Sequence, residues 1–280
     1  MFWNARGLGK PYRRSLVRKH VCTDDLEVVA LQETIKHNFE DWEIKELAGN
    51  QDFAWLWSPS KGHSGGLMIG VNLEKLEVED CIYENFFVGV LIRHRITNYR
   101  FWVINVYGPA QHNLSKDFLQ DLSFFCDNLR LPMMMGGDFN LIRNNKERNH
   151  GTGDLRLMEL FNDFIGHFQL REIFCSGNKF TWSNKQRNPT LIKLDRILVT
   201  TSWELQFPTC FAWVKYRIGS DHCPLVLNTG EKGEVRPRYF FFDEQWLHRE
   251  GFPDLVHNRW IFFREAHNYI YIGGKGAFDF

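Results

Sequence analysis

The chain has 280 residues, of which 44% are hydrophobic and 24% are charged, which is the composition of an ordinary folded protein with one large domain or one domain and an appendage. Its 34 basic residues balance its 34 acidic residues, so overall charge does not indicate a polyanion partner and any nucleic-acid contact must come from a local patch. No apolar run reaches the roughly 18 residues that span a bilayer, and no signal peptide is present. The six Cys form no CxxC pair and show no metal-like spacing. These features predict an intracellular protein with reduced thiols, for which a nuclear location is plausible.

The first half of the chain is predicted to consist mainly of strands. Short apolar runs bounded by Gly, Asn and Ser are typical of strands, and a Pro in the first turn is typical of a helix start. A turn near Thr97-Asn98 would join two of the strands in a hairpin. The expected elements are the end of a strand at 1–4, a helix from Pro11, and strands at 28–33, 53–57, 65–71, 87–93 and 99–107.

The second half carries two amphipathic helices separated by a strand. Phe118, Leu122, Phe125 and Leu129 recur at helical spacing after Ser115, a good helix N-cap. A second helix is expected over 155–168, and further strands at 180–183, 194–199, 211–214 and 224–227. Many strands with a few helices between them predict a layered α/β or α+β domain.

The strand between the two helices is the stretch on which the functional interpretation depends. It begins at Leu131, is expected to end at Gly136-Gly137, and is followed by Asp138-Phe139-Asn140. Two glycines allow a sharp turn or the close approach of a ligand. Asp138 and Asn140 would project together while Phe139 turns back into the core. A turn that merely uses Asp and Asn is the alternative interpretation.

Other polar residues also stand where predicted strands end. Val28 to Glu33 repeats the pattern of a buried strand followed by an acid, and a His beside an Asp closes the series. Each of these residues alone is more often structural than catalytic. The full set is Asn4, Glu33, Tyr107, Asp138, Asn140, Asp195, Asp221 and His222.

As an ordered set, these motifs resemble the endonuclease/exonuclease/phosphatase superfamily. The matching stretches run through about residues 1–228, and the combination of Gly-Asp-Phe-Asn, Ser-Asp-His-x-Pro and Gln-Glu-Thr is specific as a group. They are Trp3-Asn4, Gln32-Glu33-Thr34, Asn105-Val106-Tyr107-Gly108-Pro109, Gly137-Asp138-Phe139-Asn140, Thr181-Trp182, Leu194-Asp195-Arg196 and Ser220-Asp221-His222-Cys223-Pro224. The resemblance implies an α/β (α+β) four-layer sandwich of the DNase I type, with two mixed β-sheets packed face to face and flanked by helices.

Within that superfamily the chain is most similar to the apurinic-endonuclease-like domain of plant non-LTR (LINE-type) retrotransposons. WNARGLG, FTW, KLDRILV and GSDHCPL have that character, as does the segment from Arg238 to Leu247. The resemblance implies an endonuclease domain over residues 1–228 and, over 229–280, a linker and truncated segment that would lead to a reverse transcriptase. No reverse-transcriptase motif occurs in this chain.

The resemblance also implies a role for each site residue in a metal-dependent endonuclease that nicks DNA. Glu33 and Asp221 would serve a Mg²⁺ ion, for which Mn²⁺ can substitute, because hard cations prefer carboxylate oxygens. Asp138 would activate water, His222 oriented by Asp195 would hold the phosphate, and Tyr107 would donate to a phosphate oxygen. Asn4 and Asn140 would hold the phosphate or the metal's water shell. The expected DNA contacts are Arg6, Thr181, Trp182 and Arg196, with Lys185 and Arg187 as further candidates.

Two departures from the superfamily pattern bear on this interpretation. Many DNA-repair members carry an acid at the position of Arg6, so the metal site here would rest mainly on Glu33, and the first strand begins only three residues before Asn4. The same scaffold also serves phosphatases and other phosphodiesterases. A phosphatase and a catalytically idle remnant of a retrotransposon are therefore the alternatives.

Overall fold

The computed structural model describes residues 1–61, 64–230 and 251–257. Chain contacts divide the molecule into one unit over Met1–Glu234 and a second over Val235–Phe280. In the second unit the described part contains a helical turn at 252–257. Among the described helices, none combines the length and the apolar character that a membrane crossing requires.

The first unit contains two large mixed sheets. The seven-stranded sheet has the order β10-β14-β15-β1-β2-β4-β3, and the six-stranded sheet has the order β5-β6-β7-β8-β13-β9. The strands of the first sheet are β1 Phe2–Asn4, β2 Val28–Gln32, β3 Phe53–Lys61, β4 Ser64–Asn72, β10 Cys175–Ser176, β14 Phe211–Val214 and β15 Leu225–Asn228. Those of the second are β5 Leu76–Tyr83, β6 Phe87–His94, β7 Arg100–Tyr107, β8 Met133–Asp138, β9 Arg171–Glu172 and β13 Asp195–Val199, and a separate two-stranded ribbon joins β11 Trp182–Ser183 to β12 Leu191–Ile192.

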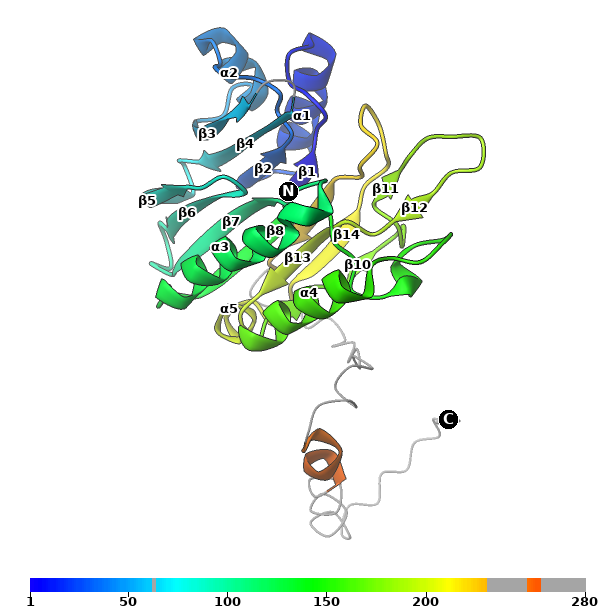
Figure 1. The fold of residues 1–280 in the computed structure, drawn as a ribbon. Helices are drawn as coiled ribbons and strands as arrows, with labels where there is room; N and C mark the ends of the chain where they lie inside the picture. The colour runs from blue at the N-terminus through cyan, green and yellow to red at the C-terminus, as the bar shows by residue number, and fades with distance from the viewer. Residues whose placement is uncertain (62–63, 231–250, 258–280) are drawn as a thin grey trace, which may run out of the picture. The chain divides into compact units, whose positions relative to one another are not determined.

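Helices cover the outer face of each sheet, so the unit has four layers (Figure 1). α1 Pro11–Thr23 and α2 Asp41–Ala48 pack on the first sheet, and α3 Ser115–Asn128 and α4 Leu155–His167 pack on the second. The remaining helical segments are η1 His112–Leu114, η2 Asn145–Glu147 and α5 Thr201–Gln206. The predicted four-layer sandwich of two facing mixed sheets is therefore confirmed.

Alternation along the central strands explains the layers. On β7, Phe101 and Val103 face the first sheet, whereas Trp102, Ile104 and Val106 belong to the core beneath α3 and α4. Strands whose two faces are both covered read as continuous apolar runs, because successive side chains point to opposite faces and both faces are buried. That is why these strands were recognisable in the sequence without a polar–apolar alternation.

The strand that carries Asp138 differs from its prediction in one respect. β8 continues through Gly136 and Gly137 to Asp138 and does not end at the glycines. A Cβ at Gly136 would lie 2.8 Å from the Phe2 ring, and a Cβ at Gly137, where φ is +130°, would lie 2.2 Å from the Val106 carbonyl oxygen. The glycines therefore allow the close approach of protein groups from the facing sheet and the neighbouring strand. The groups that approach these two glycines thus belong to the protein, whereas the sequence had suggested a sharp turn or the approach of a ligand.

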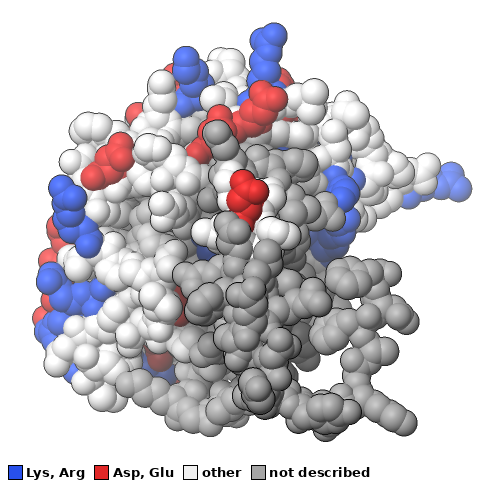
Figure 2. Space-filling model, turned by 90° about the horizontal axis from the view of Figure 1, so that it is seen from below, with Lys and Arg blue, Asp and Glu red and all other residues white. Residues whose placement is uncertain are grey.

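Charges of opposite sign are interspersed over the described surface of the face shown in Figure 2. On β5 to β7, for example, Glu79 receives ion pairs from Arg93 at 3.0 Å and Arg100 at 2.6 Å. This pattern agrees with the balanced composition and confines any anion-binding region to a local group of side chains.

Candidate active site

The most deeply buried part of the site is a group of two carboxylates and one imidazole. Asp138 ends β8 and Asp195 begins β13, and the two residues are directly paired across these antiparallel strands. His222, in the loop before β15, places Nδ1 2.9 Å from Asp195 Oδ2 and Nε2 3.6 Å from Asp138 Oδ2. All three residues are at least 98% shielded from solvent. Like charges in paired positions repel each other, so an imidazolium between them stabilises the arrangement.

Amide groups also hold the Asp138 carboxylate. Asn4, at the end of β1, donates its Nδ2 hydrogen to Asp138 Oδ2 at 3.0 Å. The backbone N–H of Asn140 donates to Asp138 Oδ1 at 3.0 Å, and its side-chain amide donates to the Gly108 carbonyl at 2.8 Å. Asp138 therefore has its orientation set by neutral donors, and the expected convergence of Asp138 with Asn140 arises through this turn.

The surroundings shift the pKa of both central groups toward useful values. Burial raises the pKa of Asp138 to about 6, with the charge of Asp195 adding to the rise and the charge of His222 and the Asn4 amide opposing it. Burial lowers the pKa of His222, but the charges of Asp195 and Asp138 more than offset this and raise it to about 9. At neutral pH the group consists of an ionised Asp138 and a cationic His222. A carboxylate with a pKa near 6 is well matched to general-base work.

A second group of charges lies at the partly exposed mouth of the site. Arg6 places Nη1 3.1 Å from Asp221 Oδ2 and Nε 3.8 Å from Glu33 Oε1. The Arg6 side chain is 49% exposed, whereas those of Glu33 and Asp221 are 12% and 14% exposed. The Trp182 indole N–H donates to Asp221 Oδ2 at 3.0 Å, so Trp182 positions this carboxylate.

Three residues of the site have a strained backbone. Arg6, Glu33 and Asn140 have φ values of 51°, 53° and 52°, a left-handed region that non-glycine residues rarely adopt. Such conformations cost about 1–3 kcal/mol each and persist where surrounding contacts enforce them. Here the Arg6 N–H donates to Asn4 Oδ1 at 3.2 Å, and the Gly7 N–H donates to the Glu33 carbonyl at 2.7 Å. The loops after β1 and β2 thus hold each other in the conformation that presents their side chains at the mouth.

Tyr107 completes the set at the end of β7, where it pairs with Asp138 on β8. Burial raises its pKa well above the ordinary value, and the charges of Glu33 and Asp138 add to the rise. The phenol therefore keeps its proton and is available as a hydrogen-bond donor at the mouth of the site.

Comparison with known proteins decides the family. The pattern of the Endonuclease/Exonuclease/phosphatase family matches residues 1–222. The chain belongs to this family. Members of the family are metal-dependent hydrolases of phosphate esters. A comparison with curated protein sequences found no match.

Solved structures share the family fold at low sequence identity. An AP endonuclease from Leishmania major has a TM-score of 0.62 and 16% identity over 80% of this chain and 85% of its own. A 3' phosphatase from Neisseria, bound to a product DNA hairpin, has a TM-score of 0.62 and 14% identity over 81% and 97%. The endonuclease domain of TRAS1, a telomere-specific non-LTR retrotransposon, has a TM-score of 0.57 and 17% identity over 76% and 90%.

Two of the residues that were expected to contact DNA are buried in this structure. Arg196 is fully buried, where it pairs with Glu147 at 2.9 Å and Glu172 at 3.2 Å and lies over the Phe161 ring. Its side chain follows the face of β13 that packs under α4, opposite to the face of Asp195. The expectation for Arg196 is therefore wrong, since a guanidinium enclosed by two carboxylates cannot reach a phosphate.

Thr181 is also interior, with 2% of its surface exposed. Its hydroxyl oxygen accepts hydrogen bonds from the N–H groups of Leu194 and Asp195, both at 3.0 Å. It therefore positions the start of β13 and does not line a DNA surface. Lys185 and Arg187 are exposed in the loop between β11 and β12, as a DNA contact requires.

The support beneath the site includes a buried amide pair to which the sequence analysis gave no role of its own. Gln32, just before Glu33, donates to Asn105 Oδ1 at 2.5 Å, and Asn105 donates to the Leu31 and Met68 carbonyls at 2.9 and 3.0 Å. These bonds join β7 of one sheet to β2 and β4 of the other. Polar residues inside runs that are otherwise apolar were the signal that could have identified this pair.

Two places offer ligands for the divalent metal that the family uses. Asp138, Asp195 and His222 bring one ligand atom each within 4.8 Å of one another. Both nitrogens of the ring face carboxylates, however, so a protonated His222 already supplies a cation there. Glu33 and Asp221 are carboxylates at the partly exposed mouth, and hard oxygen donors of this kind fit Mg²⁺. Arg6 already pairs with both of these carboxylates, but its side chain is half exposed and can be displaced, whereas His222 is buried. Among the described residues, a metal therefore fits the mouth better than the buried group.

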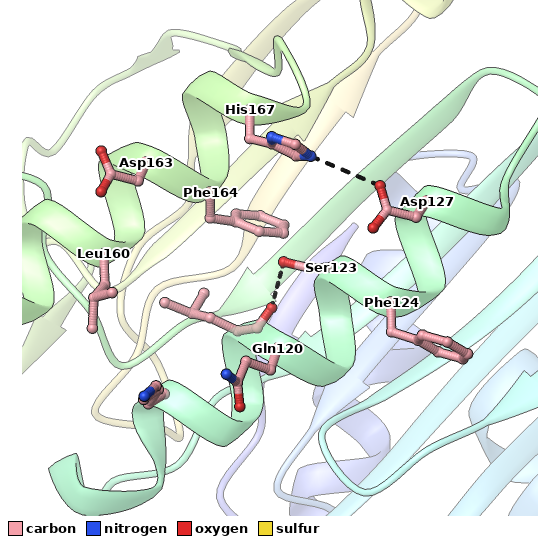
Figure 3. Close-up of a pocket in the computed structure, with 10 residues that line it drawn as sticks. Gln120, Ser123, Phe124, Asp127, Leu160, Asp163, Phe164 and His167 are labelled. Atoms are coloured by element: carbon pink, nitrogen blue, oxygen red, sulfur yellow. Dashed lines mark hydrogen bonds and ion pairs between the residues drawn. The ribbon is translucent and has the colours of Figure 1, made fainter.

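A groove with a volume of about 520 Å³ lies between α3 and α4 (Figure 3). Lys116, Leu119, Gln120, Ser123, Phe124, Asp127, Leu160, Asp163, Phe164 and His167 line it. Its His167–Asp127 pair is 3.8 Å apart, with both side chains more than 60% exposed. None of the strand-end residues borders this groove, so the site lies elsewhere.

Proposed function

We propose that this chain is a Mg²⁺-dependent endonuclease that nicks DNA, of the kind carried by plant non-LTR retrotransposons. The observation that carries the proposal is the arrangement around Asp138. Its Oδ2 accepts a hydrogen bond from the Asn4 amide and faces Nε2 of the His222 ring, while Asp195 holds the other nitrogen of that ring. One buried base and one buried cation at adjoining positions suit the hydrolysis of a phosphodiester, in which water is deprotonated while negative charge builds up on phosphorus.

In the proposed reaction, Asp138 accepts the proton of the attacking water as that water's oxygen bonds to phosphorus. Asn4 and Asn140 keep the carboxylate aimed at the water. The Nε2 hydrogen of His222 and the phenol of Tyr107 donate to non-bridging phosphoryl oxygens, where the charge develops. The bond from phosphorus to the sugar oxygen then breaks, which leaves a phosphate on one strand end and an alkoxide on the other. The alkoxide takes a proton from solvent water and becomes a hydroxyl.

Glu33 and Asp221 would hold the metal in this scheme. A bound divalent metal would polarise the phosphate and neutralise part of its charge. The Trp182 indole N–H donates to the Asp221 carboxylate at 3.0 Å, which orients this ligand before any metal arrives.

DNA would approach the mouth over the exposed loop between β11 and β12. Lys185 and Arg187 would neutralise backbone phosphates there, and Arg6 and Trp182 would meet the strand next to the reacting phosphate. These contacts carry no base identity, so target preference would depend on further contacts or on DNA shape.

A plasmid-nicking assay with Mg²⁺ tests the proposal. We expect the protein to convert supercoiled DNA to open circles only when Mg²⁺ or Mn²⁺ is present. The conversion should disappear in EDTA and in the Asp138→Asn variant. Release of inorganic phosphate from 3'-phosphorylated DNA or inositol phosphates without nicking would favour a phosphatase. No reaction on any of these substrates would indicate a catalytically idle remnant.

The domain boundary remains a prediction. We expect residues 1–228 to form the endonuclease domain and residues 229–280 to be the segment that would connect to a reverse transcriptase. A chain that ends at Asn228 should therefore fold and nick DNA as the full chain does. Loss of nicking by a folded chain of this length would place the boundary further along.

A further inference from the structure

Arg6 bridges the two carboxylates that the proposed function assigns to the metal. Its guanidinium lies 3.1 Å from Asp221 and 3.8 Å from Glu33. These acids come from different parts of the chain, the end of β2 and the loop before β15, so the same fold that gathers a metal's ligands also gathers them around this arginine. A guanidinium and a divalent cation cannot both occupy the space between these oxygens.

The backbone of Arg6 is held while its side chain is not. The Arg6 N–H donates to Asn4 Oδ1, and the next residues donate to the carbonyls of Glu33 and Thr34 at 2.7 and 2.8 Å. The Arg6 side chain is 49% exposed, so its guanidinium can move into solvent by breaking two ion pairs, whose carboxylates are 12% and 14% exposed. Ion pairs with one solvent-exposed partner are weaker than fully buried ones.

Other contacts hold the Asp221 carboxylate and the Glu33 backbone when the guanidinium leaves. Asp221 keeps its hydrogen bond from the Trp182 indole at 3.0 Å. The Glu33 carbonyl keeps the hydrogen bond from Gly7, which fixes the strained backbone at this position. Departure of Arg6 would therefore leave two carboxylates, with a formal charge of −2, without their cation.

We propose that Arg6 is a tethered cation that neutralises Glu33 and Asp221 and competes with the divalent metal for them. Metal binding displaces the guanidinium from the mouth. The wild type therefore binds the metal more weakly than a variant without this guanidinium, because binding breaks the two ion pairs and leaves the guanidinium and the metal repelling each other. The displaced guanidinium is then free to meet a DNA phosphate. The inference depends on the proposed function, because it assumes that Glu33 and Asp221 are the metal's ligands.

The test measures metal binding and not catalysis. Mn²⁺ is titrated into the protein without DNA, and free Mn²⁺ is counted by electron paramagnetic resonance. Arg6→Gln should bind Mn²⁺ about five- to tenfold more tightly than the wild type, the factor that corresponds to roughly 1 kcal/mol or slightly more. Arg18→Gln is the matched control, since it removes the same charge from an exposed position on α1 and should leave the dissociation constant within about twofold.

Glu33→Gln separates the two hypotheses. If it weakens Mn²⁺ binding while Arg6→Gln and the wild type bind alike, Arg6 does not compete and the inference is overturned, although the metal assignment stands. If Glu33→Gln binds as tightly as the wild type, or if neither the wild type nor Arg6→Gln binds Mn²⁺, the metal site itself is wrongly assigned and both hypotheses fall. Weaker binding by Arg6→Gln would show that Arg6 supports the metal and would also overturn the inference.

Discussion

Asp138 and Asp195 occupy directly opposed positions on neighbouring antiparallel strands, and the His222 ring lies between their carboxylates. Pairing two acids in this way is unfavourable unless a cation stands between them. The interaction of the His222 ring with the two carboxylates therefore stabilises this part of the fold and would also serve phosphate chemistry. Replacing His222 should change both the stability and the activity.

A double-mutant cycle tests whether Asp195 acts through His222. We expect His222→Ala to lower kcat/KM for nicking by about a hundred- to ten-thousandfold, and Asp195→Ala somewhat less. The double variant should be little worse than His222→Ala, because groups that act as one unit give non-additive losses. A double loss equal to the product of the single losses would show independent roles.

Asp138→Asn should abolish cleavage and spare DNA binding. The amide keeps the shape of the carboxylate but cannot accept the proton of water, so the rate should fall by about a hundred- to ten-thousandfold. Fluorescence anisotropy with labelled duplex and a single-turnover cleavage assay measure the two quantities separately. Cleavage within a few-fold of the wild type would assign Asp138 a structural role.

Activity should depend on pH with a plateau between two limbs. Asp138, with a pKa of about 6, must be ionised, so kcat/KM should rise as the pH increases through that value. His222, with a pKa of about 9, must be protonated, so the rate should fall above that pH. Asp195→Asn removes the main charge that raises the pKa of His222 and should move the alkaline limb to lower pH, as a pH–rate profile with saturating Mg²⁺ would reveal. An unmoved alkaline limb would assign that limb to another group.

Arg196→Met should destabilise the fold strongly without changing the salt dependence of DNA binding. Removing the cation takes the guanidinium partner from Glu147 and leaves Glu172 with only Arg143 and Lys193, and breaking a buried ion pair costs about 3–5 kcal/mol in the free energy of unfolding. Arg100→Met is the matched control, since the Arg100 side chain is 47% exposed in its pair with Glu79 and should cost less than about 1 kcal/mol. Urea denaturation measures both values.

The acid side of the same stability curve gives a second readout. Burial raises the pKa of Glu172, but the charges of Arg196, Lys193 and Arg143 outweigh burial and hold it well below the ordinary value. A depressed pKa contributes stability that is present above the unfolded-state pKa and is lost as the pH falls. The wild type should therefore lose more stability between about pH 5 and 3 than Arg196→Met does. Equal losses would mean that Arg196 does not set the ionisation of Glu172.

Salt dependence locates the DNA contact. Replacing Lys185 or Arg187 by Ala should lower the slope of log K against log salt by about one unit each, if each neutralises a phosphate. Arg100→Ala serves as the control, because Arg100 lies at the opposite end of β7 from Tyr107 and should leave the slope unchanged. If the slope stays the same in both the Lys185 and the Arg187 variants, the DNA binds to a different surface.

Most of the strands could be predicted from the sequence, because doubly covered strands are apolar throughout, whereas the four layers were implied by the resemblance to the family. α2 and β5 were missed, since their polar residues weaken the periodic signal: β5 is a partly exposed edge strand, and the first turn of α2 is acidic. Arg196 was misplaced because its neighbour Asp195 belongs to the site. Strict alternation along β13 would have put the two side chains on opposite faces.

The site could be predicted as a set of residues but not as a geometry. Strand ends indicated which side chains might meet, whereas the bridging position of Arg6 depends on two loops in left-handed conformations. Such strained backbone is enforced by tertiary contacts and leaves no local sequence signal in residues such as Arg and Glu. The burial that shifts the pKa of Asp138 and His222 likewise exists only in the folded core.

The position of β1 between β2 and β15 gives the domain a particular order of assembly. Phe2 pairs with Leu225, Trp3 donates to the His222 carbonyl at 3.3 Å, and Ser220 donates to the Asn4 carbonyl at 2.7 Å. These are contacts of very high sequence separation, which form late and slow folding. During synthesis the first strand must wait for the last before its sheet can close. His222 and β15 lie near the end of this unit, so a partly synthesised chain has neither the imidazole that faces Asp138 nor the strand that closes the sheet.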